Sequence, residues 1–510
     1  MIEQRATPGV YVTEVDGFSS AVVAVPTGIP VFLGYTAKDS AKTASTALPV
    51  RISSLAEYID IFGAAAQIEY DYVSNSQATP PYLANKAAPA FGLYYGLELF
   101  FNNGGGICYV LSLGTYGEVI AAGAFNKDDY TNALPIAAGC AEADLLVMPD
   151  AVHLGLDDWA SVSQLALQSC EQSQHIICLL DVHNGYLAAD GSAQDPITGG
   201  TGSGGFYKIA GLGDEFNKYG VSYYPWLNTN IVSLGEIDYS WISVASLPLL
   251  VADLSVEAPT LFPPSNSSAP SPKLQSYLNI VNALTQGGDA VAVRQRHQSL
   301  MAVSPLYQFC MSNIATSVNL LPPAAAMAGV YARTDHTFGV FQSPANTTII
   351  NAISPVVVIN DQQQSALNVP LNGLAVNAIR TFPNYGLLVW GARTLAGNSD
   401  DWRYINVRRT VMMIEQSIKL ALQAYVFQAN DSLTWTSVSA AISNFLNALW
   451  KEGGLVGSNA TDAYSVSVGF GSTMTAQDIL DGVMNVMVKV ALVHPAEFIV
   501  LTFQQQMQTS

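Results

Sequence analysis

The chain has 510 residues, of which 50% are hydrophobic and 12% are charged, and its formal net charge at pH 7 is −19. This length suffices for roughly two to four domains with large cores, and the composition excludes a disordered chain. The acidic balance argues against nucleic acid as a general partner, because binding phosphate groups requires a basic face.

The charged fraction is low and the mean hydropathy of +0.26 is high for a soluble monomer of this size. A monomer of this size should carry a more charged surface, so we expect other copies of the chain to cover much of it. Membrane insertion is the competing explanation, but no run of about 18 uncharged apolar residues occurs. The first residues lack the pattern of a secretory signal, and the five cysteines form no Cys-x-x-Cys pair. Reduced thiols in a cytosolic protein are therefore expected.

The N-terminal segment combines β-rich runs with a linker. Residues 8–15 alternate as a strand does, residues 16–20 read as a linker, and residues 22–36 continue as β-rich chain. Extended chain spans roughly 3.3 Å per residue, so an arm of about 20 residues reaches on the order of 60 Å. Such an arm is long enough to contact a neighbouring subunit.

From residue 51 to residue 184 the sequence alternates between helix-like and strand-like segments. The predicted helices cover residues 54–62, 88–101 and 159–173, and the predicted strands cover residues 107–111, 145–150 and 175–182. This alternation is typical of an α/β fold.

Two of these predicted strands end in acidic residues and histidines: Asp150 and His153 at one end, Asp181 and His183 at the other. Enzymes with α/β folds place their sites at such strand ends, so an α/β hydrolase-like or metal-dependent enzyme is one hypothesis. Such residues also commonly cap helices or bind loop amides. Because H-E-x-x-H and G-x-S-x-G are absent and a single Asp-x-His is a weak metal signal, the sequence favours the structural role. We therefore expect no catalytic residue, no metal and no cofactor.

Residues 375–427 form a basic island in this acidic chain. A strand is expected over residues 386–391, and from Ile405 the apolar residues recur in steps of three or four, which predicts a helix of about six turns ending near Phe427. The basic residues of this window are Arg380, Arg393, Arg403, Arg408, Arg409 and Lys419, against the acidic Asp400, Asp401 and Glu415. Two interpretations stay open for the arginines: a solvated face with weak surface ion pairs, or a binding site.

The C-terminal part is predicted to contain a further helix and two strands. Thr434 or Thr436 is expected to cap a helix that ends before Gly453, and residues 464–470 alternate as a strand does. Residues 496–503 are apolar on both faces of the predicted strand. A terminal strand of this kind must be covered and paired in a sheet.

Between these two strands, Thr475 and Asp478 have the spacing of a capping box. This spacing predicts a helix over residues 476–490, which carries Asp478, Asp481 and Lys489 on a mostly apolar body.

Several blocks of the sequence resemble the tail sheath proteins of contractile phages and of extracellular contractile injection systems. The most specific match is residues 377–383 together with residues 388–395, which contain the run Trp390-Gly391-Ala392-Arg393-Thr394, and residues 403–409 follow as in that family. The other matching blocks are residues 8–15, 25–36 and 321–335. These blocks lie at both ends and in the middle, so the resemblance spans nearly the whole chain.

The resemblance implies a mixed α/β, multi-domain sheath fold. Its conserved inner domain is formed from both ends of the chain, and insertion domains face outward. The implied division is an N-terminal arm and linker strand over residues 1–28, a first insertion domain over residues 29–118, an outer insertion domain over residues 119–335, and the inner, tube-facing domain with a C-terminal arm over residues 336–510.

In such sheaths, the terminal arms of one subunit add strands to a sheet on its neighbours. The residues that the resemblance assigns to strand exchange are Val10, Tyr11, Val12, Val15, Val22, Val25, Phe498, Val500, Leu501 and Phe503. Those assigned to the inner-domain core or to contacts between subunits are Arg380, Trp390, Arg393, Arg408 and Arg409. The predicted helix over residues 476–490 resembles the element by which sheaths touch the tube, which assigns tube contact to Asp478, Asp481 and Lys489. A core helix with ordinary capping is the alternative.

The implied function is that of a structural, non-enzymatic subunit that polymerises helically around an inner tube and contracts to drive the tube through a target envelope. Its implied partners are copies of itself, the inner tube protein, and baseplate and terminal cap proteins, with a second sheath paralogue as a further candidate, but no nucleic acid and no membrane. The chain would assemble in the bacterial cytoplasm and then become part of a virion or of an extracellular phage tail-like particle. A non-contractile tail structural protein, which would form filaments of a single diameter, is the alternative.

Overall fold

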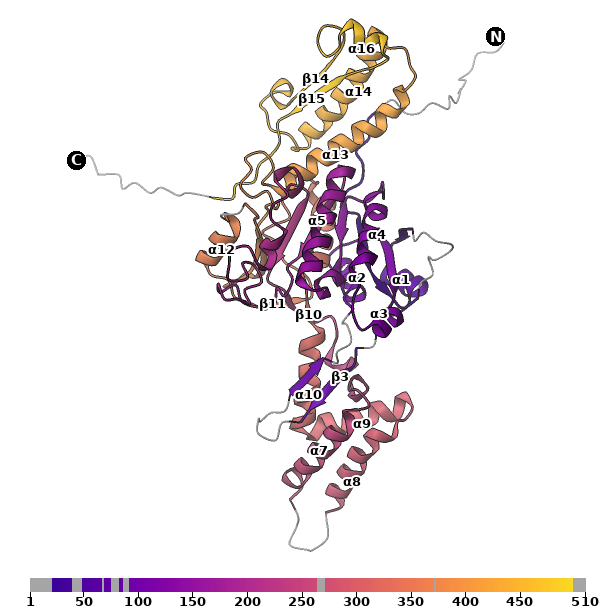
Figure 1. Cartoon of the computed structure of the whole chain (residues 1–510), viewed down its shortest axis with the longest axis vertical. Helices are drawn as coiled ribbons and strands as arrows, with labels where there is room; N and C mark the ends of the chain where they lie inside the picture. Colours follow the sequence, from indigo (N-terminus) through magenta and orange to yellow (C-terminus); the bar gives the residue numbers. More distant parts are fainter. Residues whose placement is uncertain are drawn as a thin grey trace, which may run out of the picture. The chain divides into compact units, whose positions relative to one another are not determined.

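The structure is a computed structural model, and it describes residues 21–38, 48–66, 68–74, 82–85, 91–263, 271–370 and 373–498. The chain forms two compact units, which we call the sheet unit (residues 26–409 and 494–510) and the terminal unit (residues 1–25 and 410–493). Figure 1 shows the path of the chain through their elements. Each unit therefore combines segments that lie far apart in the sequence.

The sheet unit is built around an eight-stranded sheet in the order β13-β12-β8-β7-β6-β1-β5-β2. The central strands are all parallel, whereas β13 and β2 pair antiparallel at the two edges. The strands are β1 (Pro30–Thr36), β2 (Val50–Ile52), β5 (Cys108–Thr115), β6 (Leu145–Val147), β7 (Ile177–Asp181), β8 (Gly220–Tyr224), β12 (Asn377–Phe382) and β13 (Gly386–Trp390). The predicted mixed α/β fold class is confirmed.

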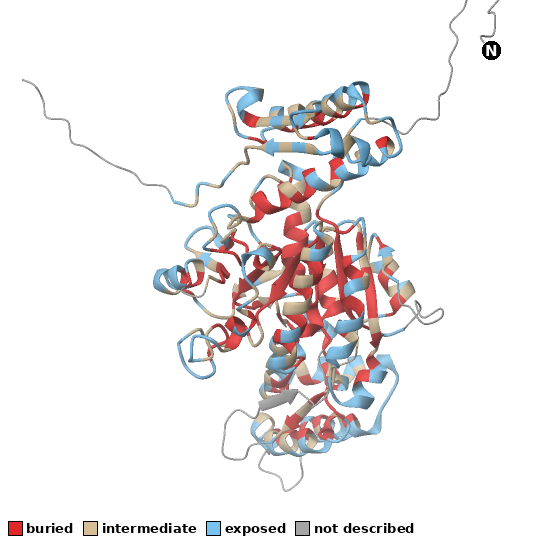
Figure 2. Cartoon of the chain, turned by 45° about the horizontal axis from the view of Figure 1, so that its top comes forward, coloured by how far each residue is buried: buried red, intermediate tan, exposed pale blue. Residues whose placement is uncertain are grey.

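Helices cover both faces of this sheet. Every residue of β1, β6, β7 and β8 is buried, as parallel strands in the middle of a sheet require (Figure 2). Helix α2 (Leu93–Asn102) packs against α11 (Ala324–Phe338), and α4 (Lys127–Ala138) packs against α5 (Leu156–Ser173). A Cβ atom on Gly329 of α11 would lie 2.4 Å from the carbonyl oxygen of Phe100 in α2. Only a residue without a side chain allows the two helices to approach this closely.

Smaller elements complete the sheet unit. A three-stranded sheet has the order β10-β9-β11, and β3 pairs with β4. Four helices, α7 (Leu247–Leu261), α8 (Pro272–Asn282), α9 (Ala290–Val303) and α10 (Pro305–Val318), form an insertion between β9 and β10. The other elements are α1 (Leu55–Phe62), β3 (Tyr70–Val73), β4 (Tyr82–Asn85), α3 (Tyr116–Ala122), η1 (Pro149–His153), η2 (Gly205–Ile209), α6 (Asp214–Asn217), β9 (Leu227–Thr229), η3 (Leu234–Glu236), η4 (Tyr239–Trp241), η5 (Ala283–Gln286), β10 (Leu320–Leu321), β11 (Ala352–Pro355) and α12 (Asp361–Asn368).

The terminal unit packs helices on a two-stranded sheet. Its elements are α13 (Ile405–Leu422), whose first residues belong to the sheet unit, η6 (Gln423–Tyr425), α14 (Ser432–Lys451), α15 (Ala460–Ala463), β14 (Tyr464–Val468), α16 (Ala476–Leu480) and β15 (Val486–Val490). Strands β14 and β15 pair antiparallel, with Val466 opposite Val488. Helix α14 contacts β14 and buries Val438, Ile442 and Leu446. The predicted long helix and the predicted strand over residues 464–470 are thus confirmed.

The helix predicted over residues 476–490 is wrong. Helix α16 ends at Leu480, and the residues from 486 to 490 form strand β15. Gly482 has a φ of +73°, which lies in the left-handed region and ends the helical path. Beyond it, half-buried and exposed residues alternate as in a strand. The sequence itself is apolar at most positions from 483 to 490, so it fits helical spacing as well. The predicted capping box of Thr475 and Asp478 is present.

Helix α14 begins earlier than predicted. The carboxylate of Asp431 accepts hydrogen bonds from the backbone nitrogen atoms of Leu433 and Thr434, so Asp431 is the cap, and neither Thr434 nor Thr436 has this role. An aspartate is among the strongest N-caps, which explains why the helix starts at this point.

The strands of the large sheet come from all three ranges predicted as separate domains, residues 29–118, 119–335 and 336–510. Strand β6 pairs with β1, and β12 pairs with β8. The three predicted ranges therefore share one sheet. Strand pairing joins segments that the sequence separates by many residues. Among the residues that the structure describes, no helix is both long enough and apolar enough to cross a membrane.

Candidate functional site

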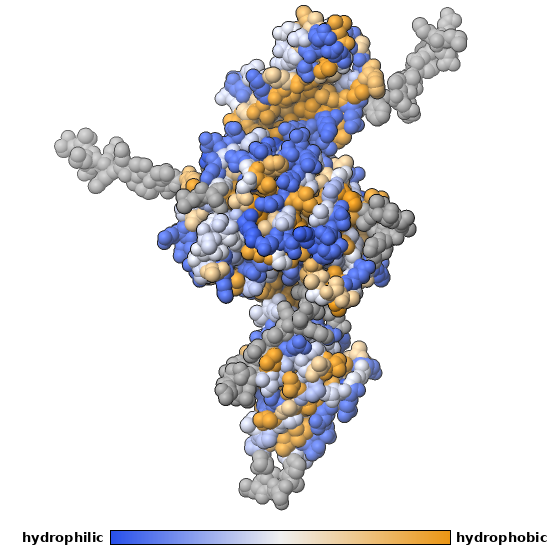
Figure 3. All heavy atoms as spheres, in the orientation of Figure 1, coloured by the Kyte–Doolittle hydropathy of each residue, from blue (hydrophilic) through white to orange (hydrophobic). Residues whose placement is uncertain are grey.

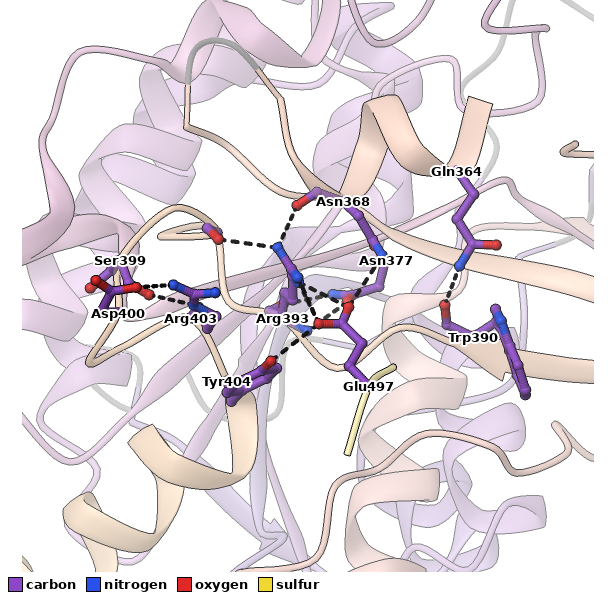
Figure 4. Close-up of polar contacts among 11 residues, drawn as sticks. Gln364, Asn368, Asn377, Trp390, Arg393, Ser399, Asp400, Arg403, Tyr404 and Glu497 are labelled. Carbon is purple, nitrogen blue, oxygen red and sulfur yellow. Dashed lines mark hydrogen bonds and ion pairs between the residues drawn. The ribbon is translucent and has the colours of Figure 1, made fainter. Parts of the chain in front are cut away.

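Arg393 and Glu497 form a largely buried ion pair at the centre of the candidate site (Figure 4). The Nε atom of Arg393 lies 3.0 Å from Oε1 of Glu497, and its Nη2 atom lies 2.6 Å from Oε2. The side chain of Arg393 is 4% exposed and that of Glu497 is 19% exposed. The Nη1 atom donates to the carbonyl oxygens of Asn368 (2.9 Å) and Gly397 (3.3 Å). Every nitrogen of this guanidinium thus has an acceptor, as a buried charge requires.

Two further donors hold Glu497. The hydroxyl of Tyr404 lies 3.2 Å from Oε2, and Nδ2 of Asn368 lies 3.2 Å from Oε1. Burial raises the pKa of Tyr404, and the negative charge of Glu497 adds to this effect. Glu497 belongs to residues 494–498, the last described segment of the chain. Charge-assisted hydrogen bonds therefore fasten this segment to the sheet unit.

Asn377 explains why Arg393 takes this position. Asn377 is fully buried at the start of β12, and its Oδ1 atom accepts a hydrogen bond of 2.7 Å from the backbone nitrogen of Arg393. Its Nδ2 atom donates to the carbonyl oxygens of Arg393 (2.7 Å) and of Ser222 on β8 (3.1 Å). A Cβ atom on Gly391 would lie 2.7 Å from Oδ1 of Asn377. The glycine two residues before Arg393 is therefore needed for the close approach of the two chain segments.

Arg409 forms a second buried network within the sheet unit. Its guanidinium binds both carboxylate oxygens of Asp335, at 2.8 and 2.6 Å, and Oδ2 of Asp144 at 2.7 Å, and it lies 4.9 Å from the ring centre of Tyr331. The other oxygen of Asp144 accepts from the backbone nitrogen of Ile29. Burial acts to lower the pKa of Arg409, but the charges of Asp335 and Asp144 outweigh it and raise that pKa. The two terminal nitrogens of Arg409 are thus paired with carboxylates in the interior of the sheet unit.

The other residues of the predicted core-or-contact group differ in exposure. Arg408 is 3% exposed and lies 4.5 Å from the ring centre of Tyr219. Arg380 pairs with the exposed Asp361 at 2.8 Å. The interpretation of Trp390 as a core residue is wrong, since it is 38% exposed. It ends β13, the edge strand of the large sheet, beyond which no further strand lies in the described residues.

These positions test the solvated-face interpretation of the basic island. The solvated-face interpretation is wrong for Arg393, Arg408 and Arg409, which are 2 to 4% exposed. Contact with other subunits stays a prediction, and Arg380 and Trp390 are the more exposed members of the group.

The acidic residues of the enzyme hypothesis bind backbone amides. Asp150 accepts from the backbone nitrogen atoms of Tyr35 and Gly92, and Asp181 accepts at 2.8 Å from that of Ala324 in the first turn of α11. Burial raises the pKa of Asp150 to about 6 and that of Asp181 to about 7, although the hydrogen bonds lower both. Both carboxylates have the structural role that the sequence favours.

The two histidines of this hypothesis also have local partners. His153 stacks on Phe125 with ring centres 5.4 Å apart, and Nε2 of His183 lies 3.0 Å from the carbonyl oxygen of Leu154. Burial lowers the pKa of His153 to about 4 and also lowers that of His183. In the described ranges, no three histidine, cysteine or acidic side chains are grouped to hold a metal ion.

The residues predicted to contact the tube lie on two different elements. The carboxylate of Asp478 in α16 accepts from the backbone nitrogen and the hydroxyl of Thr475, and these bonds lower the pKa of Asp478. Asp481 follows α16 and accepts from Gln477, while Lys489 is exposed on β15. The alternative of a core helix is wrong, because α16 has no buried residue. Tube contact stays a prediction.

Three residues of the predicted arms lie in the described part of the chain. Residues 22–25 form no strand there, and the backbone nitrogen of Val25 donates to Oγ of Ser417 at 2.9 Å. Phe498 is 74% exposed and is not part of a strand. The other residues predicted for strand exchange lie outside the described residues: Val10, Tyr11, Val12, Val15, Val500, Leu501 and Phe503.

An apolar groove of about 530 Å³ opens between α13 and β15 in the terminal unit. The apolar residues that line it are Val411, Ile414, Ile418, Leu422, Val426, Val486, Val488 and Val490. Figure 3 shows hydrophobic residues gathered over this part of the unit. Within the described residues, the sheet of β14 and β15 ends after two strands. Apolar side chains of a helix and of a strand thus face open space that further chain can fill.

Two residues of the buried networks were missed in the sequence. Glu497 lies in the run over residues 496–503 that reads as an apolar strand, and its single charge in that run was the available signal. Asp144 lies 265 residues from its partner Arg409, and no local pattern connects the two.

Comparisons with known proteins place part of the chain in a described family. The model of the phage tail sheath C-terminal domain matches residues 398–506. The tail sheath protein of Salmonella phage ViI is 28% identical over 137 residues, which are 26% of this chain and 21% of that protein. The match therefore spans about a fifth of that relative's length.

Solved sheath structures are similar over nearly the whole chain. A chain of the sheath of the extracellular contractile injection system PVC, in the contracted state, is 25% identical with a TM-score of 0.57 and 99% coverage of both chains. A chain of the helical sheath of the anti-feeding prophage, also contracted, is 27% identical with a TM-score of 0.60, covering 98% of this chain and 100% of that one. The family model, the phage relative and the two sheath structures thus agree that this chain is similar to contractile tail sheath proteins, which are structural proteins.

Proposed function

We propose that this chain is the repeating subunit of a sheath that polymerises helically around an inner tube and contracts to drive the tube through a target envelope. The observation that carries the proposal is the open apolar groove between α13 and β15, beside a sheet that has only two strands among the described residues. A two-stranded sheet is marginal by itself and gains stability from added strands. This groove is therefore a place where a second copy can add chain.

The proposed donors are the terminal arms of neighbouring copies. An added strand gains affinity from main-chain hydrogen bonds, and its alternate side chains enter apolar pockets that set the register. The groove offers such pockets, because Val486, Val488 and Val490 line it at alternate positions of β15. The alternation of Val10, Val12 and the following residues in the N-terminal arm fits this spacing.

The buried pair of Arg393 and Glu497 supports the proposal from the donor side. It fixes residues 494–498 on the sheet unit, directly before the proposed C-terminal arm. Because the residues directly before the arm are held in one position, the arm can reach only one neighbour. This favours a regular lattice. A head-to-tail contact of this kind that does not close into a ring generates a helical polymer.

Contraction in this proposal is a switch between two packings of the same subunits. The copies assemble on the tube in an extended lattice of higher free energy and rotate as rigid bodies into a wider and shorter lattice. The arms keep neighbours connected during this rotation. The energy is stored during assembly, so no nucleotide is consumed during firing.

The proposed partners follow from this role. They are copies of the chain, the inner tube protein, and baseplate and terminal cap proteins, with a second sheath paralogue as a further candidate. The net charge of −19 supports a role without nucleic acid. We place assembly in the bacterial cytoplasm, followed by a role in a virion or an extracellular phage tail-like particle. The exposed helix α16 with Asp478 and Asp481, and Lys489 on β15, are the proposed tube contacts.

Electron microscopy of the expressed full-length chain tests the proposal. A contractile sheath is expected to appear as striated cylinders of two lengths and widths, whereas a non-contractile tail protein would form filaments of one diameter. Deletion of residues 1–20 is expected to abolish long cylinders and to leave a folded subunit. Normal cylinders from that deletion variant would exclude the N-terminal arm as a donor.

A further inference from the structure

Gly28 and Ile29 hold the N-terminal segment firmly in the sheet unit, directly before it enters β1. The backbone nitrogen of Ile29 donates to Oδ1 of Asp144 at 2.7 Å, and its carbonyl oxygen accepts from the backbone nitrogen of Asp144 at 3.0 Å. Gly28 has a φ of +75°, and a Cβ atom there would lie 2.7 Å from the Cα atom of Ala332 in α11. Both residues are buried, and we call this contact the anchor.

A buried charge network reinforces the anchor. The other carboxylate oxygen of Asp144 accepts a hydrogen bond of 2.7 Å from Nη2 of Arg409. The same nitrogen lies 2.6 Å from Oδ2 of Asp335 in α11. Pulling Ile29 away from Asp144 would therefore disturb a buried ionic network, which is strongly unfavourable.

Residues 22–26, which we call the strap, are held much more weakly than the anchor. None of them is buried, and Val23 is 71% exposed. Their one hydrogen bond to another described residue joins the backbone nitrogen of Val25 to Oγ of Ser417 in α13, at 2.9 Å. Pro26 has no N–H group to donate. A single hydrogen bond adds little to the stability of a contact.

The strap is also poorly packed on helix α14. A pocket of about 400 Å³ is lined by residues 21–24 on one side and by the second half of α14 on the other, including the small side chains of Ala441 and Ala448. Well-packed protein leaves few voids larger than a water molecule. The strap can therefore leave α14 with the loss of few dispersion contacts.

We propose that the strap is a releasable reserve of chain that lengthens the N-terminal arm when the sheath contracts. This inference rests on the proposed function, in which a neighbouring copy holds the arm while the subunits rotate. A pull on the arm breaks its weakest attachment first, so the strap leaves Ser417 and α14, whereas the anchor holds. The five residues of the strap span at most about 18 Å when extended. This length lets the arm follow a moving neighbour without leaving it.

A disulfide that closes the strap tests this proposal. Val25→Cys and Ser417→Cys place thiols at the two ends of the single hydrogen bond, and oxidised glutathione links them. Sheaths of the oxidised variant on purified tube are expected to assemble at normal length. In dilute urea they are expected to shorten at least about tenfold more slowly than the same sheaths after reduction. Equal rates would overturn the proposal, as would thiols that do not pair or an oxidised variant that does not assemble.

A cross-strand disulfide is the matched control. Ser467 on β14 lies opposite Met487 on β15, so Ser467→Cys with Met487→Cys links two elements of the same unit without involving the strap. The oxidised control is expected to contract at the rate of the wild type. An equal block of contraction by this control would overturn the inference.

Hydrogen exchange at two comparable amides gives a second readout. The backbone nitrogen atoms of Val25 and Ile29 both donate to side-chain oxygens, one in the strap and one in the anchor. Between extended and contracted sheaths, exchange at Val25 is expected to accelerate at least about tenfold and exchange at Ile29 to stay unchanged. Unchanged exchange at Val25 would overturn this inference alone, whereas wild-type cylinders that never shorten would contradict the proposed function.

Discussion

The guanidinium of Arg393 makes three hydrogen bonds to the carboxylate of Glu497, which lies 104 residues further along the chain. Asn377 fixes the backbone of Arg393 on the large sheet, so the ion pair transfers the rigidity of the sheet to residues 494–498. The start of the proposed C-terminal arm is therefore set by an electrostatic contact inside the sheet unit.

Replacing Glu497 by glutamine tests this anchor. The change leaves Arg393 buried without its counter-charge, which is expected to lower the free energy of unfolding by about 1 to 3 kcal/mol. The loss stays below that for a completely buried pair, since Glu497 is 19% exposed. Denaturant unfolding measures the loss, and hydrogen exchange of residues 494–498 is expected to accelerate. Asp361→Asn is the matched control: it breaks the pair with Arg380, in which Asp361 is 95% exposed, and should cost less than about 1 kcal/mol. Equal losses in the two variants would contradict the anchor.

Replacing Arg409 by methionine is expected to be more destabilising. The variant keeps Asp335 and Asp144 in the interior without their cation, and breaking a buried pair in this way typically costs about 3 to 5 kcal/mol. Thermal and denaturant unfolding of the monomer measure the effect. Arg403→Met is the control, since its partner Asp400 is 95% exposed. A loss below about 1 kcal/mol for Arg409→Met would show that the network does not stabilise the sheet unit.

The buried carboxyl of Asp181 predicts a pH dependence of stability. Burial raises the pKa of Asp181 to about 7 in the folded chain, against roughly 3.9 in the unfolded chain. The folded state then binds more protons, so the stabilising contribution is complete below about pH 4 and is lost as the pH rises to about 7. Asp181→Asn, which keeps an acceptor for the amide of Ala324, is expected to raise stability by about 1 to 3 kcal/mol at pH 8 and to change it little at pH 4. Melting temperatures at both pH values test this, and equal shifts at both would rule out the titration.

A charge in the groove between α13 and β15 tests the proposed docking of a neighbouring arm. Val488→Asp places a carboxylate among the apolar residues that line the groove. The variant is expected to fold but to form few cylinders, because a docked strand would bury the unpaired charge. Ser467→Asp, at an exposed position of β14, is the control and should leave assembly intact. Sedimentation of polymer is the measurement, and normal assembly of Val488→Asp would remove the groove as the docking site.

The predicted tube contact is best tested at Asp481 alone. Asp478 binds Thr475 as part of the cap of α16, so its reversal would also disturb the helix. Asp481→Lys is expected to weaken assembly on purified tube roughly fivefold, as about 1 kcal/mol of lost contact would do. Assembly of the same variant without tube is the control and should not change. An unchanged affinity for tube would exclude Asp481 from the contact.

Several parts of the fold could be predicted because their signals are local. The apolar stripe of α13, the strand ending at Trp390 and the capping box at Thr475 depend on residues only a few positions apart. The helix predicted through Val490 was wrong for a related reason: over five residues, apolar spacing cannot distinguish a helix from the strand that Gly482 makes possible. Trp390 was misplaced because exposure depends on which strand forms the edge of the sheet.

The sequence by itself determined the acidic balance, the α/β class and the resemblance to sheath proteins, because these depend on composition and on contiguous motifs. Only the tertiary structure decided what the arginines do. Whether an arginine is solvated or buried depends on which carboxylate reaches it, and the partners Glu497 and Asp144 lie 104 and 265 residues away from Arg393 and Arg409. The periodicity of apolar residues carries no information about contacts over such distances. Pairing of strands from distant segments brings these charges together in the interior, where each buried charge needs a partner.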